Sequence, residues 1–174
     1  WINYNDAGMK QFERSTQYIF KEQSSPAKYR GSYNLSVSNP SHGVEIIQNR
    51  WKPRGNRIFK HGIISFGVRN LAPEKAVEVT DEILQIYKAY PLLFAIHTDI
   101  PHRIHAHFIM CMTNVFTGKK FEQDYTEFER FRNHYNETVI KNGLPSLKGY
   151  KLNDAEELKT GSTGLVNIQN NIGD

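Results

Sequence analysis

Apolar residues recur at helical spacing in three parts of the chain. In residues 9 to 20, Met9, Phe12 and Ile19 fall on one helical face. Pro73 is a favourable first-turn residue for a second helix, which we expect to end before Pro91. A third helix is predicted from about Phe121 until Gly143 breaks it, and its apolar stripe would contain Phe121, Tyr125, Phe128, Phe131, Tyr135 and Val139.

Four shorter stretches have the β-branched and aromatic content of strands, namely residues 31–38, 58–68, 92–97 and 103–113. The last two are separated by a short connection, which predicts an antiparallel pair because parallel strands need a long crossover. A basic segment rich in Gly, Pro and Asn joins the first two and is interpreted as a connection. The pattern predicts an α/β fold with an antiparallel or mixed sheet. We assign residues 1–148 to this domain and 149–174 to a polar tail or linker.

The composition is that of a globular protein of 174 residues, 39% of them hydrophobic. No stretch approaches the roughly 18 uninterrupted apolar residues of a membrane span, so we expect no membrane insertion. Cys111 is the only cysteine, which excludes an internal disulfide and a cysteine-based zinc site. No basic-then-apolar leader opens the chain. A cytoplasmic location is therefore the expectation.

Positive charge is concentrated in one region. The net charge is +4, but residues 23–73 contain eight basic residues and one acidic residue, so this segment carries +7 and the remainder −3. Such asymmetry is typical of a protein that binds a polyanion such as a nucleic acid. A solvated basic loop would give the same pattern, and charge alone does not choose between the two.

Four of the seven histidines lie between residues 97 and 107. On a strand, residues two apart share a face, so His105 and His107 would project side by side, and His97 at the end of the preceding strand supplies a third imidazole. Asp99 is placed to orient one of these rings or to assist as a ligand. A solvated polar face is the alternative, but three histidines at this spacing favour a metal site.

Three neutral nitrogen ligands leave positions on a metal open, which is typical of a catalytic site rather than a structural one. The basic segment makes a phosphodiester a natural substrate. For that substrate Mg²⁺ or Mn²⁺ would serve as a Lewis acid, and Zn²⁺ is a further option for an all-histidine site.

Tyr18 falls opposite the apolar face of the first predicted helix, so it is not a core residue of that face. It is a candidate nucleophile or simply an exposed tyrosine. Tyr4, Tyr29 and Tyr33 are rivals on the same grounds. A phenol attacking a phosphodiester needs a base or nearby positive charge, which Asp99, a histidine or the cation would supply.

Several segments together resemble the relaxase/mobilisation nuclease family, and more narrowly the P-type relaxases of plasmids and integrative conjugative elements. The similarity covers roughly residues 9 to 125 and is carried by Tyr18-Ile-Phe-Lys-Glu-Gln, His61-Gly-Ile-Ile-Ser65-Phe, Ala95-Ile-His97-Thr-Asp99-x5-His105-x-His107-Phe-Ile and Asn114-Val-Phe-Thr-Gly118-Lys-Lys-Phe. The resemblance implies the HUH endonuclease fold, a central, largely antiparallel sheet flanked by helices. This fold agrees with the order of helices and strands predicted above.

By this resemblance Tyr18 matches the catalytic tyrosine, His97, His105 and His107 match the metal ligands, and Ser65 matches the serine near the scissile phosphate. The implied activity is nicking of one DNA strand at an origin of transfer by tyrosine attack, which forms a 5′-phosphotyrosyl intermediate that is later rejoined. Conjugative transfer or mobilisation is the implied role. The implied partners are single-stranded and origin hairpin DNA, a relaxosome accessory protein and a coupling protein.

Contacts to DNA are expected from the basic segment. Trp51 suits stacking on an unpaired base, although it would equally serve as a core aromatic that anchors a loop. The residues suited to phosphate contacts are Lys28, Arg30, Arg50, Lys52, Arg54, Arg57 and Lys60.

Three other functions share part of this pattern. A rolling-circle replication initiator or transposase has the same metal site, but in initiators the tyrosine follows the histidines, often as Tyr-x-x-Lys, and no such motif occurs downstream here. A zinc-dependent hydrolase of small molecules would explain the histidines alone. A DNA-binding module without catalysis would explain the charge alone.

Overall fold

The computed structural model describes residues 8–55, 57–100 and 102–147. Its secondary structure comprises four α-helices, two short 3-10 turns and four strands within these ranges. The elements are α1 (Met9–Ile19), η1 (Ala27–Tyr29), β1 (Arg30–Tyr33), α2 (Pro40–Trp51), β2 (Phe59–Ser65), α3 (Pro73–Leu84), η2 (Gln85–Tyr87), β3 (Leu92–His97), β4 (His105–Cys111) and α4 (Tyr125–Lys141).

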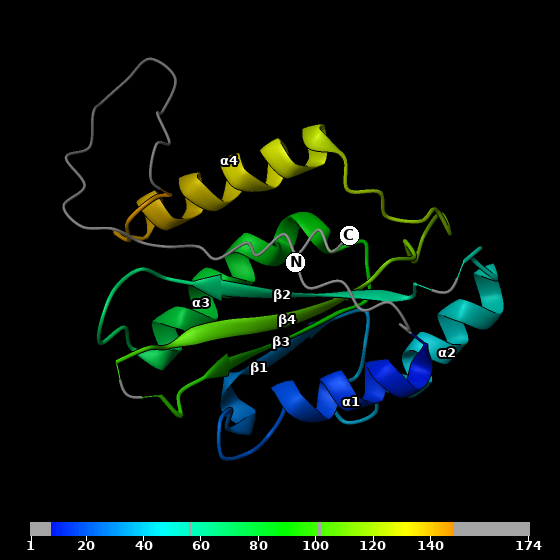
Figure 1. Cartoon of the computed structure of the whole chain (residues 1–174), viewed down its shortest axis with the longest axis horizontal. Coiled ribbons are helices and arrows are strands. Elements are labelled where there is room, and N and C mark those ends of the chain that lie inside the picture. Colours follow the sequence, from blue (N-terminus) through cyan, green and yellow to red (C-terminus); the bar gives the residue numbers. More distant parts are fainter. Residues whose placement is uncertain (1–7, 56, 101, 148–174) are drawn as a thin grey trace, which may run out of the picture.

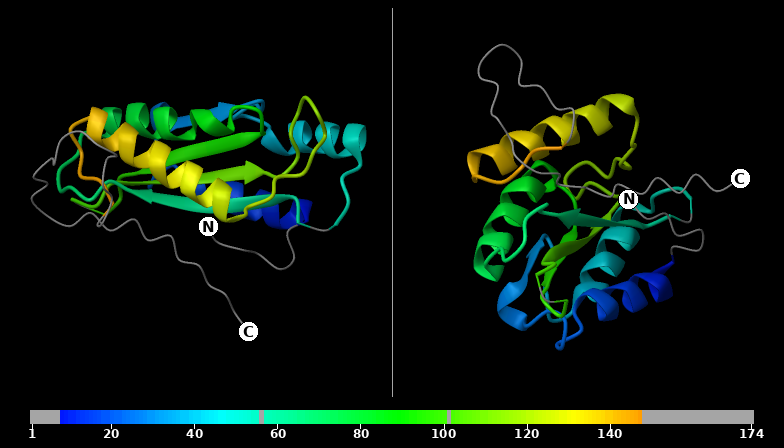
Figure 2. Two further views of the ribbon diagram at one scale, coloured as in Figure 1. Left: turned by 90° about the horizontal axis from the view of Figure 1, so that it is seen from above. Right: turned by 60° about the vertical axis from the view of Figure 1, so that its left-hand side comes forward.

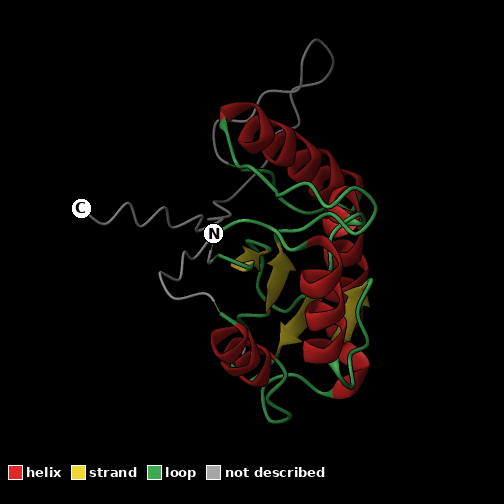
Figure 3. Ribbon diagram, turned by 90° about the vertical axis from the view of Figure 1, so that its right-hand side faces the viewer, coloured by secondary structure: helices red, strands yellow, loops and turns green. Residues whose placement is uncertain are grey.

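The four strands form one sheet in the order β1-β3-β4-β2, and every neighbouring pair is antiparallel. Helices α1 and α2 lie on one face, whereas α3 and α4 lie on the other (Figures 1 and 3). The predicted fold class, an α/β protein with an antiparallel sheet flanked by helices, is confirmed. Because β3 and β4 occupy the centre, both are covered by helices on both faces.

Alternation along the strands divides the core into two layers. Phe94, Phe108 and Met110 face α3 and α4 and join one apolar cluster. Their neighbours in the strands, such as Leu93 and Ile109, turn to the opposite face and join a second cluster with residues from α1 and α2. Since side chains alternate between faces, a central strand buried on both sides is apolar at nearly every position, which explains the continuous apolar runs of β3 and β4.

The segment that the sequence pattern assigned to a connection contains helix α2, so that interpretation was wrong. Asn39 caps this helix by accepting a hydrogen bond from the His42 backbone N–H, at 3.4 Å, and Pro40 occupies its first turn. Within the helix only Val44 is buried. Because the helix buries so little apolar surface, its apolar residues show only a weak helical period. The Asn39-Pro40 pair, an N-cap followed by a first-turn proline, was the better sequence signal for this helix.

Helix α4 begins later than predicted. Asp124 caps it by accepting from the Glu127 N–H, at 2.8 Å, and Phe121 precedes the helix, packing edge-on against Tyr87. Tyr125 is 77% exposed, so its assignment to the apolar stripe was also wrong. The cap at Asp124 sets the start of the helix, and the helical spacing of Phe121 is coincidental.

No helix in the described ranges is both long enough and apolar enough to cross a bilayer. The polar tail predicted for 149–174 lies outside the described residues, as does Tyr4.

Candidate metal centre and nucleophile

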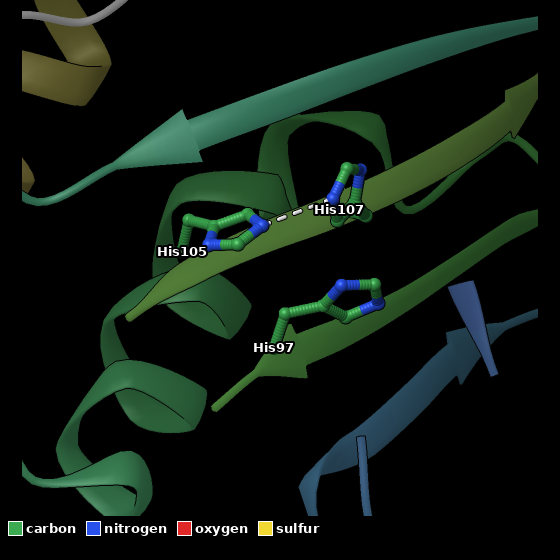
Figure 4. Close-up of side chains that lie close together, drawn as sticks. All are labelled: His97, His105 and His107. Atoms are coloured by element: carbon green, nitrogen blue, oxygen red, sulfur yellow. Dashed lines mark hydrogen bonds between the residues drawn. The ribbon is translucent and has the colours of Figure 1, made fainter. Parts of the chain in front are cut away.

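Three histidines converge at one end of the two central strands. His97 is the last residue of β3, and it pairs directly with His105, the first residue of β4. His107 lies two residues further along β4 and therefore on the same face (Figure 4). One nitrogen from each ring lies within 4.8 Å of the others. The structure thus brings together the three predicted ligands on one face of the sheet.

Backbone carbonyls determine which nitrogen two of these rings can offer. A carbonyl oxygen only accepts hydrogen bonds, so the nitrogen facing it must carry the proton. The Ile19 carbonyl accepts from Nε2 of His97, at 2.9 Å, and the Arg103 carbonyl accepts from Nδ1 of His105, at 3.0 Å. The unprotonated nitrogens are consequently Nδ1 of His97 and Nε2 of His105. Nε2 of His105 lies 3.1 Å from Nε2 of His107, so these two nitrogens face each other.

Burial favours the neutral form of His107 and His97. The pKa of His107 is lowered to about 2, chiefly because burial penalises the charged ring and also because His61, His97 and His105 lie nearby. Burial likewise lowers the pKa of His97 below its ordinary value. A neutral imidazole keeps a lone pair, which metal coordination requires. The donor set therefore fits a divalent cation with imidazole affinity.

A fourth histidine completes the cluster, and the sequence pattern did not identify it as a site residue. His61 on β2 is buried, and its Nε2 lies 2.9 Å from Nδ1 of His107. Its pKa is lowered to about 4, first through burial. For His107 to offer Nε2 to a metal, its proton must sit on Nδ1, where Nε2 of His61 would accept it. The sequence did offer one signal for His61, because His61 and Ser65 are four residues apart on one strand and so share a face. Which residues of β4 they face depends on the register of the β2–β4 pair, which the sequence does not reveal.

Tyr18 lies at the C-terminal end of α1 against this cluster. Its ring centroid is 5.4 Å from that of His107 and 5.8 Å from that of His97, and the residue is 56% exposed. The hydrogen bond from His97 to the carbonyl of Ile19 fastens the end of this helix to β3. Tyr18 is thus both exposed to solvent and adjacent to two of the three candidate ligands.

The other described tyrosines that rivalled Tyr18 are occupied elsewhere. The hydroxyl of Tyr29 donates to Glu74, at 2.9 Å, and Tyr29 is buried in the cluster below α3. Tyr33 donates to Asp81, at 2.6 Å, and burial raises its pKa well above the usual range. Neither ring contacts the histidine cluster in the described part of the chain.

Two further predicted site residues flank the cluster. Ser65 pairs directly with His105, so it lies on the same face of the sheet. Asp99 does not orient an imidazole as predicted, because its carboxylate accepts from Ser24 Oγ, at 3.1 Å, while the Ile19 carbonyl orients His97. Thr98 N–H also donates to the Ser24 carbonyl, at 2.8 Å. Asp99 therefore helps to hold the loop after β3 against the segment that follows α1.

The residues predicted to contact phosphates do not form one continuous belt, because α2 separates them. Lys28 pairs with Glu74 at 3.6 Å, away from the histidines. Arg30 is only 13% exposed at its side chain and donates to Glu22 and the Ser25 carbonyl. Lys60 is 5% exposed and donates to Gln123, since the even positions of β2 face α4. Lys60 is therefore not a surface residue, and that assignment was wrong.

Four of the predicted phosphate-binding residues are exposed at the end of α2 and just after it, namely Arg50, Lys52, Arg54 and Arg57. Trp51 occupies the second of its two predicted roles. Its Nε1 donates to the Val115 carbonyl, at 3.3 Å, and its indole packs against Gly118, so it anchors the loop that follows β4.

Comparison with known protein families identifies a match over most of this domain. The family described as relaxase, MobA/VirD2-like, nuclease domain matches residues 17–144. This range contains Tyr18, all three candidate ligands and all four strands of the sheet. No curated protein matches the chain. Since the match spans most of the 174 residues, the chain belongs to the MobA/VirD2-like relaxase nuclease-domain family.

Proposed function

We propose that this domain nicks one DNA strand at an origin of transfer by attack of Tyr18 on the scissile phosphate. The observation that carries the proposal is the position of an exposed phenol directly against His97 and His107. The family match supports nuclease activity on DNA, and the proposal adds the nucleophile and the type of reaction.

In this reaction the Tyr18 oxygen bonds to phosphorus while the bond to the 3′ oxygen breaks, and the phenolic proton ends on the released 3′-OH. The product is a 5′-phosphotyrosyl linkage that conserves the energy of the broken bond, so the 3′-OH can reverse the attack and rejoin the strand. A divalent cation held by His97, His105 and His107 would polarise the phosphate and stabilise its developing charge. Ser65, opposite His105, would contact the same phosphate.

Asp99 would act indirectly by holding the chain after β3 beside α1. The substrate is expected to be single-stranded DNA next to an origin hairpin, because an exposed phenol on a helix end needs an accessible backbone. Mg²⁺ or Mn²⁺ is the expected cofactor, with Zn²⁺ as the option that an all-imidazole site also permits. Conjugative transfer or mobilisation in the cytoplasm, with an accessory protein and a coupling protein, is the corresponding biological role.

The test is to mix the purified domain with Mn²⁺ and single-stranded oligonucleotides that tile the DNA beside its own gene. We expect an SDS-resistant band of increased mass with one oligonucleotide, absent with chelator and absent in Tyr18→Phe. Tyr29→Phe is the matched control and should form the band, because its hydroxyl is bound to Glu74.

Cleavage without a covalent band would overturn the tyrosine mechanism and indicate water as the nucleophile. A band that persists in Tyr18→Phe would assign the attack to another tyrosine.

A further inference from the structure

The loop that joins β4 to α4 exposes an aromatic side chain. Phe116 is 72% exposed, whereas most other phenylalanines in the described residues are buried or half-buried. Residues 114–120, which we call the 114–120 loop, lie beside the C-terminal end of α2 at one end of the sheet (Figure 2). The ring is therefore accessible to a ligand at this end of the sheet.

Hydrogen bonds hold the 114–120 loop in one shape. The side chain of Asn114 accepts from the N–H groups of Phe116, at 2.9 Å, and Thr117, at 3.1 Å, as in an Asx turn. Its backbone N–H donates to the Lys119 carbonyl, at 2.9 Å, and its carbonyl accepts from the Gly118 N–H, also at 2.9 Å. The exposed ring is therefore carried by an ordered turn rather than by an unconstrained tip.

Helix α2 and the residues just after it hold the 114–120 loop in place. Trp51 donates to the Val115 carbonyl, and Lys120 Nζ donates to the Arg54 carbonyl at 2.9 Å. Gly118 has a φ of +68°, and a β-carbon at this residue would lie 2.3 Å from a ring carbon of Trp51. A glycine is thus required both by the turn and by the close approach of the indole.

Basic residues lie on the 114–120 loop and at the end of α2 that contacts it. Arg50 lies over the indole of Trp51, with its Cζ 5.1 Å from the ring centroid. Lys52 and Arg54 follow α2 directly, and Lys119 is exposed on the 114–120 loop itself. Glu122 is the nearest exposed acid that follows in sequence. An exposed aromatic ring on a loop with basic residues on and beside it matches the chemistry of unpaired nucleic acid, in which phosphates alternate with bases that stack on aromatic rings.

We propose that Phe116 is a stacking platform for one unpaired base of the bound strand, and that the cations on this loop and at the end of α2 hold the neighbouring phosphates. This inference rests on the proposed function, because it assumes a single-stranded DNA ligand. Four residues of β4 separate His107 from Cys111, about 13 Å at a rise of about 3.3 Å per residue, and the platform lies on the loop beyond that end of the strand. It would therefore contact a base several nucleotides away from the nick and serve binding rather than chemistry.

The test measures the dissociation constant of a fluorescent single-stranded oligonucleotide by anisotropy, using the sequence that forms the covalent band. Phe116→Ala should weaken binding about tenfold, the scale of one lost base–aromatic contact. Phe116→Trp should retain binding, and Phe116→Leu should not, because an aliphatic side chain has no aromatic face. The matched control is Tyr125→Ala, which removes an equally exposed aromatic from the acidic start of α4 and should bind as the native domain does.

Salt dependence separates stacking from charge. Lys119→Ala should lower the slope of the logarithm of affinity against the logarithm of salt concentration by about one phosphate contact. Phe116→Ala should leave that slope unchanged. Native affinity in Phe116→Ala, or an equal loss in Tyr125→Ala, would overturn the platform while covalent band formation still upheld the proposed function. A native domain that neither binds nor cleaves any oligonucleotide would overturn both.

Discussion

Among individual residues, His61 is the one whose hydrogen bond sets which nitrogen of His107 carries the proton. The Ile19 and Arg103 carbonyls fix the protons of His97 and His105, but His107 faces another imidazole, which can either donate or accept. Only when His61 accepts does His107 present Nε2 to a metal. His61 is thus expected to be a positioning residue for the metal site.

Replacing His61 by Leu removes the acceptor and should weaken Mn²⁺ binding by about 10- to 100-fold, as is typical when the partner of a ligand histidine is lost. His61→Gln should stay within a few-fold of the native affinity, because its amide oxygen can still accept from Nδ1–H. The measurement is calorimetric titration with MnCl₂, with His42→Leu, an exposed histidine on α2, as control. Native Mn²⁺ affinity in His61→Leu would contradict the positioning role of His61.

Lys60 predicts a pH dependence of stability. Burial, assisted by Arg57, lowers its pKa to about 8, below the ordinary value of 10.5 expected for the unfolded chain. Between these values the unfolded chain binds more protons, so the free energy of unfolding should rise with pH from about 8 to 10.5. Lys60→Met should lack that rise, amounting to a difference of up to about 3 kcal/mol between the two profiles. Urea unfolding across this pH range is the measurement, and parallel profiles would contradict the assignment.

At the level of helices and strands, the sequence pattern predicted which strand residues share a face, because that depends on alternation along one strand. It missed contacts that depend on how strands pair with one another. The strand period placed His105 and His107 on one face, and β3 is observed with its predicted bounds. Helix α2 was missed because it buries only Val44. The role of His61 was missed because it requires the β2–β4 register, in which Ile63 pairs with His107. A register of this kind is a property of the assembled sheet.

The β2–β4 pairing also predicts a packing constraint. Gly62 lies opposite Phe108, and a β-carbon at this residue would fall 2.3 Å from a carbon of that ring. Gly62→Ala should destabilise the domain by about 1–3 kcal/mol, because a filled core must shift to admit the methyl group. Gly8→Ala, where nothing lies within 4 Å, is the control, and denaturant unfolding is the measurement. Equal stability of the two variants would show that Phe108 can move without cost.

For the molecule as a whole, the candidate metal site joins three strands of the sheet to helix α1. The candidate ligands come from β3 and β4, the proposed positioning residue from β2 and the proposed nucleophile from α1, so a bound cation should stabilise the fold as a whole. At a Mn²⁺ concentration 100 times the dissociation constant, the expected gain is about 2.7 kcal/mol. Thermal unfolding should show a higher Tm with Mn²⁺, reversed by chelator and diminished in His105→Ala. An unchanged Tm at saturating Mn²⁺ would contradict this linkage.

The central claim is that Tyr18 forms the covalent bond to DNA, and its most direct test is to locate that bond. The covalent complex would be digested with protease and nuclease, and the nucleotide-bearing peptide would be sequenced by tandem mass spectrometry. We expect a nucleotide attached through its 5′ phosphate to Tyr18. A nucleotide on any other tyrosine, or a linkage through a 3′ phosphate, would contradict it.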